Sequence, residues 1–279
     1  MIVESKKIGP FEVLLGLFAL FWLMVAFSPL YYMVITTFKE QMELARQGIF
    51  AFPRLPNLSN YRNVLSGNFP IYLRNSVLVL VASSLLTLVA ASFAAYPFSR
   101  MTFRWNKPLY GFVVATMAVP IHMTLIPVFL LTVNMGIYDS IWALIGPYVA
   151  FNLPVSVFIL SSFMADIPKE LEESAAMDGC NKYQTFFHVI LPLSKSGLAT
   201  ITIFNGVTMW NEFSFALVLT QSVQNRTLPL GIWDYQGQYA GNVPLIMTML
   251  FLTTLPMIIA FAVGKEKLIK GMMAGAVKG

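Results

Sequence analysis

Long apolar stretches alternate with short polar segments along almost the whole chain. Aspartate, glutamate, lysine and arginine are absent from seven windows, namely residues 13–38, 75–99, 108–138, 140–165, 196–211, 213–225 and 235–264. A helix needs about 20 mostly apolar residues to cross the hydrocarbon core of a bilayer, and most of these windows are long enough. The pattern predicts six membrane-spanning helices, at roughly 12–36, 75–98, 108–131, 139–163, 197–220 and 243–264.

The composition agrees with this pattern. Hydrophobic residues make up 57% of the chain and charged residues only 11%, and the mean hydropathy is +0.69. A soluble domain of this length is far more polar, so we expect an all-α integral membrane protein. The whole chain, 1–279, is expected to form one transmembrane domain with a core at about 72–264. The first apolar run is too long for a signal peptide and has no small-x-small cleavage site, so it is interpreted as an uncleaved span.

The distribution of basic residues predicts the orientation. If both termini are cytoplasmic, twelve of the 18 lysines and arginines lie on the cytoplasmic side, as the positive-inside rule requires. The tail at 265–279 is then cytoplasmic as well. The basic residues are scattered between spans, which argues against nucleic-acid binding despite the net charge of +5. The single cysteine, Cys180, excludes an internal disulfide.

A charged loop, residues 166–195, interrupts the apolar pattern between spans four and five. Asp166 or Ile167 can cap a helix, Pro168 suits its first turn, and Gly179 can end it in the left-handed conformation. Three glutamates near the start complement the helix dipole. We therefore expect a helix from Pro168 to Asp178, too short and too polar to cross the membrane.

The residue types of this helix indicate a docking surface. Small residues at 174–176 allow the backbone of another protein to approach closely, and the glutamates can pair with basic groups. A solvated amphipathic loop helix is the alternative. After it, an apolar stripe at helical spacing can lie on the membrane surface until Leu191-Pro192 turns the chain into span five; the stripe consists of Tyr183, Phe186, Phe187 and Ile190.

Two segments of this loop carry a family resemblance. Glu173-Ser-Ala-Ala-Met-Asp-Gly179, followed after nine residues by Val189-Ile-Leu-Pro192, resembles the "EAA" loop in permease subunits of ATP-binding-cassette (ABC) importers. The chain departs from the pattern at Ser174 and Val189, both conservatively. It is also similar to the carbohydrate branch, the second permease of maltose-type importers, in these segments: Ile167–Glu173, Pro120, Pro127, Trp210–Phe213 and Gly271–Gly279.

The resemblance implies a type I importer permease in a bacterial or archaeal cytoplasmic membrane, carrying a sugar or oligosaccharide. A polyol or glycerol phosphate remains open as cargo. Its implied partners are two ATPase subunits, a second homologous permease, an extracytoplasmic sugar-binding protein and membrane lipid. The implied ATPase-docking residues are Glu172, Glu173, Ser174, Ala175, Ala176, Asp178 and Gly179.

The chain itself has no pattern for catalysis. It contains no G-x-x-x-x-G-K-[ST] phosphate loop, no metal-ligand cluster and no nucleophile–base arrangement. We expect a subunit that is not an enzyme and binds no cofactor, with ATP and magnesium held by the ATPase subunits.

A polar cluster in span five is the candidate solute path. Glu212 is the one charged residue predicted in the interior of a span, where it is costly and often marks a pathway. Contact between the two permeases is an equally good interpretation of these polar groups. An ion-coupled secondary transporter that uses Glu212 is the alternative function. The path candidates are Asn152 in span four, beside helix-breaking prolines, and Asn205, Thr208, Trp210, Asn211 and Glu212 in span five.

Overall fold

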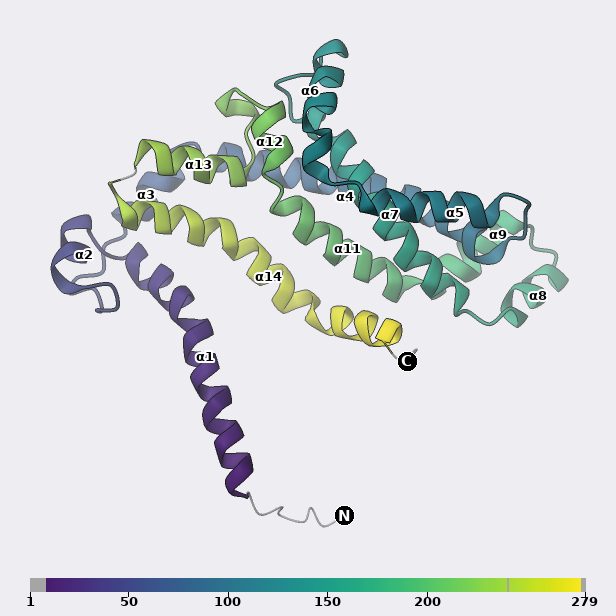
Figure 1. Cartoon of the computed structure of the whole chain (residues 1–279), viewed down its shortest axis with the longest axis horizontal. Coiled ribbons are helices and arrows are strands. Elements are labelled where there is room, and N and C mark those ends of the chain that lie inside the picture. Colours follow the sequence, from purple (N-terminus) through teal and green to yellow (C-terminus); the bar gives the residue numbers. More distant parts are fainter. Residues whose placement is uncertain (1–8, 240, 277–279) are drawn as a thin grey trace. The chain divides into compact units, whose positions relative to one another are not determined.

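The computed structural model describes residues 9–239 and 241–276, and all regular structure in this part is helical (Figure 1). The chain divides into two compact units. The first comprises Met1–Gly67 and Asp234–Thr254, and the second comprises Asn68–Trp233 and Leu255–Gly279. The expectation of one permease domain over 1–279 concerns a functional unit and stays a prediction.

The first unit begins with a long helix that has almost no cover from the rest of the unit. Helix α1 (Pro10–Thr37) starts with proline at its first position, and Glu12 accepts a hydrogen bond from the Gly9 amide (3.1 Å). None of its most apolar 18-residue window is buried. An uncovered apolar helix of 28 residues is stable in lipid and not in water. The unit also contains α2 (Gln41–Gln47), α3 (Ser59–Ser66) and the first part of α14 (Val243–Ala276).

Three long helices form the centre of the second unit. Helix α4 (Phe69–Arg100) packs along α7 (Trp142–Ala165), and α11 (Lys195–Trp210) contacts both (Figure 1). Gly197 allows α11 to approach α7 closely, because a Cβ atom there would lie 2.8 Å from the Phe163 ring. One core cluster includes Ala91 and Ala95 of α4, Leu160 and Met164 of α7 and Ile201 of α11.

This unit also contains the part of α14 that follows Thr254, and a set of shorter helices. They are α5 (Asn106–Ala115), η1 (Thr116–Ala118), η2 (Ile121–Thr124), α6 (Leu125–Asn134), α8 (Glu170–Met177), α9 (Lys182–Thr185), η3 (Phe186–Ile190), α10 (Leu191–Leu193), α12 (Ser214–Leu219), η4 (Val223–Asn225) and most of α13 (Leu228–Gln238).

Four described helices are long and apolar enough to cross a membrane: α1, α4, α7 and α14. Two further pairs of helices bring the number to six if each bent pair counts as one span. The described chain therefore agrees with the expected all-α membrane protein, although two of its expected spans are not straight.

The third span, predicted at 108–131, is bent at one of the two prolines in its interior. The chain bends by 93° between Ala118 and Ile121. Pro120 has no amide hydrogen for the helical ladder, and it pushes Val119 into extended backbone (ψ 115°). The fifth span also differs, because α11 ends at Trp210 and not near residue 220. The fourth starts at Trp142, so Asp139 lies in the preceding loop.

The two prolines of span four interrupt its hydrogen-bond ladder without ending the helix. Helix α7 continues through both Pro147 and Pro154 over 24 residues. Neighbouring helices cover α7, and such packing holds a helix together across a missing hydrogen bond. A pocket of about 270 Å³ lies beside the second proline and is lined in part by Ala150, the residue whose carbonyl Pro154 leaves without its helical donor.

Candidate functional site

The helix of the charged loop is shorter than expected. It runs from Glu170 to Met177, eight residues, whereas the sequence predicted Pro168 to Asp178. Lys169 is its N-cap and no side chain caps it, so the expected capping by Asp166 or Ile167 was wrong. The carbonyls of Ile167 and Pro168 instead accept hydrogen bonds from Arg100, which holds this backbone outside the helix.

The end of this helix confirms the expected role of Gly179. Its φ is +82°, in the left-handed region that residues with a Cβ avoid. The Gly179 amide donates to the Ala176 carbonyl (3.1 Å) and the Cys180 amide donates to the Ala175 carbonyl (2.9 Å). These two bonds are the Schellman motif, which satisfies carbonyls that the helix end would otherwise leave without donors.

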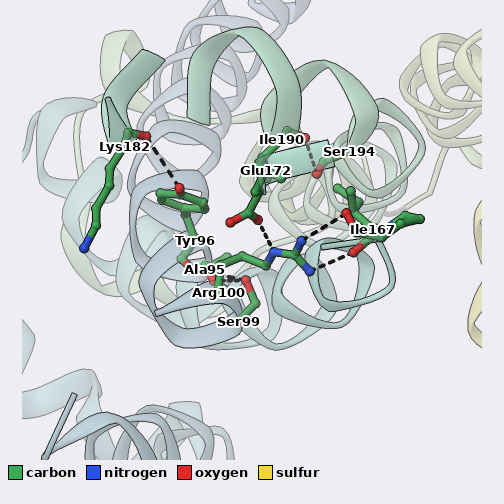
Figure 2. A network of polar contacts seen from close by, with 10 residues as sticks. Ala95, Tyr96, Ser99, Arg100, Ile167, Glu172, Lys182, Ile190 and Ser194 are labelled. Carbon is green, nitrogen blue, oxygen red and sulfur yellow. Dashed lines mark hydrogen bonds and ion pairs between the residues drawn. The ribbon is translucent and has the colours of Figure 1, made fainter. Parts of the chain in front are cut away.

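Arg100 fastens the loop to the end of α4, a contact that sequence reasoning missed. Its side chain is only 3% exposed, and its guanidinium forms an ion pair with Glu172 (Figure 2). The same group donates to the carbonyls of Ile167 (2.8 Å) and Pro168 (3.5 Å). The sequence did contain a signal for this contact: a basic residue stands at the end of a span, and the loop helix on the same side carries acidic residues with which it can pair.

The predicted docking residues fall into two sets in the structure. Glu172 and Ala175 face the protein, since Glu172 is paired with Arg100 and Ala175 is 7% exposed. The others are exposed and available to a second protein; they are Glu173, Ser174, Ala176, Asp178 and Gly179. Met177 also stands out, 82% exposed on a helix end between polar groups. The docking role itself stays a prediction.

Three predicted path residues meet α7 in a row of polar pairs. Asn205 donates to Ser156 Oγ (3.0 Å), and Thr208 Oγ1 donates to Asn152 Oδ1 (2.6 Å). Next in the row, Tyr148 donates its hydroxyl proton to Glu212 Oε2 (2.9 Å). Sequence reasoning missed the partners on α7 other than Asn152. The signal was their spacing, because positions 148, 152 and 156 share one helical face.

A pocket of about 220 Å³ lies along this row. Tyr148, Asn152, Thr208 and Glu212 contribute polar groups to its wall, and the remaining lining is apolar. Neither Trp210 nor Asn211 lines it. Trp210 is 5% exposed, and Asn211 donates to the Val207 carbonyl of its own helix (2.8 Å). Four of the six path candidates therefore share a site: Asn152, Thr208 and Glu212 in the wall, with Asn205 behind them.

Glu212 does not lie within a helix, although a continuous helix over the predicted fifth span would have included it. It occupies the turn between α11 and α12. Its carboxylate accepts hydrogen bonds from the backbone amides of Phe215 (2.9 Å) and Ala216 (3.3 Å). These amides belong to the first turn of α12, where a carboxylate is favoured by unpaired donors and by the helix dipole. The charge is thus compensated by backbone and Tyr148 together.

A second polar cluster joins two loops of the same unit. Asp139 has a positive φ of 54°, and its carboxylate accepts hydrogen bonds from the Gln221 and Ser222 amides (2.8 Å each) and from the Ser222 hydroxyl. Burial alone would raise the pKa of the Asp139 carboxyl, but these bonds, with one from Asn225, outweigh it and hold the pKa at about 2. Loop 135–141 is thereby tied to the segment that follows α12.

The sequence and fold of the chain identify its family. Residues 87–268 match the family described as binding-protein-dependent transport system inner membrane component, so the chain belongs to it and is an ABC transporter permease. A protein named ABC transporter permease ORF2, from Caldicellulosiruptor sp. (strain Rt8B.4), is 50% identical over 94% of this chain and 96% of its own.

Two other relatives are named for their cargo. The sulfoquinovosyl glycerol transport system permease of Agrobacterium fabrum is 33% identical over 90% of this chain and 88% of its own. The trehalose/maltose transport system permease of Thermococcus litoralis is 31% identical over 96% and 97%. In fold, the chain matches a bacterial ABC transporter involved in alginate import with a TM-score of 0.78 at 22% identity, covering 95% of this chain and 98% of that one.

Proposed function

We propose that this permease carries a sugar or oligosaccharide across the cytoplasmic membrane, and that ATP is hydrolysed in separate ATPase subunits. The cargo class is supported by the relatives named for sulfoquinovosyl glycerol and for trehalose and maltose. A polyol or glycerol phosphate is the alternative cargo. The family gives no support to the ion-coupled alternative.

The mechanism is inferred from one observation: helix α8 is exposed on its outer side, and Arg100 links its inner side to the end of α4. Helix α8 presents Glu173, Ser174, Ala176 and Asp178 outward, while Arg100 ties its inner side to α4. A force applied by a docked ATPase would therefore reach α4 through a buried charged contact. It would also reach α7 directly, since α8 follows that helix after four residues. Movement of these two helices would open the permease alternately to each side.

We further propose the following assembly: two ATPase subunits that bind ATP and magnesium, a second homologous permease, and an extracytoplasmic sugar-binding protein. Both termini are cytoplasmic in this arrangement. Residues 277–279 of the expected cytoplasmic tail lie outside the described part of the chain. The pocket between α7 and α11 is the candidate for part of the solute path. Its hydroxyl, amide and carboxylate groups can form hydrogen bonds with a sugar.

Purification of the tagged chain from its own host tests the docking role. We expect an ATPase to co-purify, and Glu173→Lys or Gly179→Pro to release it or to abolish transport while the permease still inserts. Glu173→Gln is the matched control, since it removes the charge and preserves the size. Normal transport by either Glu173→Lys or Gly179→Pro would show that the docking role is wrong. Transport of a sugar without ATP would favour the ion-coupled alternative.

A further inference from the structure

Two neighbouring pockets lie where the charged loop meets the spans. The first, about 280 Å³, is an apolar groove lined by residues of α4, η3 and α11, among them Val89, Phe187 and Leu198. The second, about 350 Å³, is lined by Tyr96, Met101, Lys182 and Tyr183 among others. Phe93 and Phe186 line both pockets, and their ring centroids are 5.4 Å apart. The pockets therefore share one aromatic wall.

The groove opens on surface that a membrane would cover. Two of its walls come from α4 and α11, and exposed apolar side chains line it: Val89 at 55%, Phe93 at 50% and Phe187 at 48% exposed. Water does not stabilise such a surface, whereas lipid hydrocarbon does. Lipid acyl chains therefore fit the groove better than any polar ligand.

The second pocket lies at the level of the loop, and Lys182 is among the residues that line it. In the part of the chain that the structure describes, the Lys182 ammonium has no hydrogen bond or ion pair. The Lys182 carbonyl accepts hydrogen bonds from the Tyr96 hydroxyl (3.5 Å) and from the Phe186 amide. Figure 2 shows its side chain extending away from Arg100. The carboxylate of Glu172, on the same loop, is engaged by Arg100. Tyr183, 75% exposed, adds an amphipathic ring of the kind enriched at membrane interfaces.

We propose that the two pockets together bind one phospholipid with an anionic headgroup. An acyl chain lies in the groove against Phe187 and Leu198, and the phosphate lies beside Lys182. This bound lipid holds the segment 182–193 on the membrane surface, next to the loop helix. The proposal depends on the membrane location of the chain and not on its cargo or on ATPase docking.

The test uses the full-length chain, with the subunits that co-purify, in nanodiscs of phosphatidylcholine and phosphatidylglycerol. Retained lipid is counted by native mass spectrometry. One lysine near an anionic membrane surface contributes about 1 kcal/mol to the free energy of lipid binding. Lys182→Gln should therefore lower phosphatidylglycerol retention about fivefold. Lys195→Gln is the matched control: this lysine is exposed, is the last residue of the same loop and lines neither pocket. Val89→Trp, which fills the groove, should lower retention of the same lipid.

Equal phosphatidylglycerol retention by Lys182→Gln and Lys195→Gln would overturn the proposal, whether or not Val89→Trp can be purified. A photo-reactive amino acid at Phe187 in native membranes gives a second measurement. Adducts with phospholipid are the expected result. Adducts with another protein chain would overturn the proposal, because they would assign the groove to a subunit interface.

Discussion

The guanidinium of Arg100, the last residue of α4, is paired with the carboxylate of Glu172 in α8 (Figure 2). Hydrogen bonds from the same guanidinium to two loop carbonyls make Arg100 the main polar link between a membrane span and the loop helix. Since its side chain is 3% exposed, solvent screens this contact poorly.

Replacement of Arg100 should release the loop. Arg100→Gln leaves a partly buried carboxylate without its cation and the Ile167 carbonyl without the Arg100 donor, which we expect to lower the free energy of unfolding by about 3 kcal/mol. Thermal unfolding and limited proteolysis of residues 166–181 measure the effect. Arg104→Gln is the control, because Arg104 is exposed and lies over the Trp105 ring, 5.7 Å from its centroid. If both variants are equally stable, Arg100 does not hold the loop.

Substitution of Gly179 should act through the backbone alone. No atom lies within 4 Å of the position where a Cβ would be added, so space is not limiting. Gly179→Val forces a β-branched residue to φ +82° and should cost about 1–2 kcal/mol. Gly179→Asn should cost clearly less, since asparagine tolerates this conformation. Hydrogen exchange of the 170–177 amides reports the difference, and equal protection in both variants would contradict it.

The row of polar pairs between α7 and α11 should contribute measurable coupling. We expect a double-mutant cycle of Asn152→Leu and Thr208→Val to give about 0.6–1.7 kcal/mol, which spans the average and the maximum found for hydrogen bonds between membrane helices. Thr202→Val serves as control, because the Thr202 hydroxyl donates only to Leu198 of its own helix (2.7 Å). A coupling energy near zero would mean that the Asn152–Thr208 hydrogen bond does not stabilise the contact between these helices.

Glu212 should act as the cap of α12 rather than as an ion site. Glu212→Ala removes the acceptor for two backbone amides and Tyr148, and should destabilise the unit by about 1–2 kcal/mol. Glu212→Gln preserves an acceptor and should retain most of the transport activity. Complete loss of transport in Glu212→Gln, with normal stability, would instead support an ion-coupled function.

The Asp139 carboxylate links loop 135–141 to the segment that follows α12, and only strong acid should weaken this link. The pKa of Asp139 is lowered to about 2 from 3.8, so its stabilising effect is present above pH 4 and is lost as the pH falls through about 2. Asp139→Asn should remove this dependence and loosen the segment 220–225 at neutral pH. Hydrogen exchange of the Gln221 and Ser222 amides between pH 5 and 2.5 measures it. Loss of protection in the parent chain already at pH 5 would contradict the prediction.

Much of the fold follows from local patterns in the sequence. Charge-free windows located α1, α4, α7 and α14, because a helix in lipid needs only length and apolar side chains. The left-handed end at Gly179 followed from the same kind of local reasoning, since few other residues adopt that conformation at low cost. The bend at Pro120 could be predicted from the sequence only in part. The sequence shows the missing donor there, but the 93° angle depends on what packs around it.

The sequence by itself determined the membrane class, the approximate spans, the polar loop helix with its glycine end and a family resemblance that the comparisons confirmed. Only the tertiary structure decided which polar groups meet. Arg100 and Glu172 are 72 residues apart, and Tyr148 and Glu212 are 64 apart. Pairing over such separations is set by how whole helices pack, and a pattern read along one helix cannot identify the partner on another.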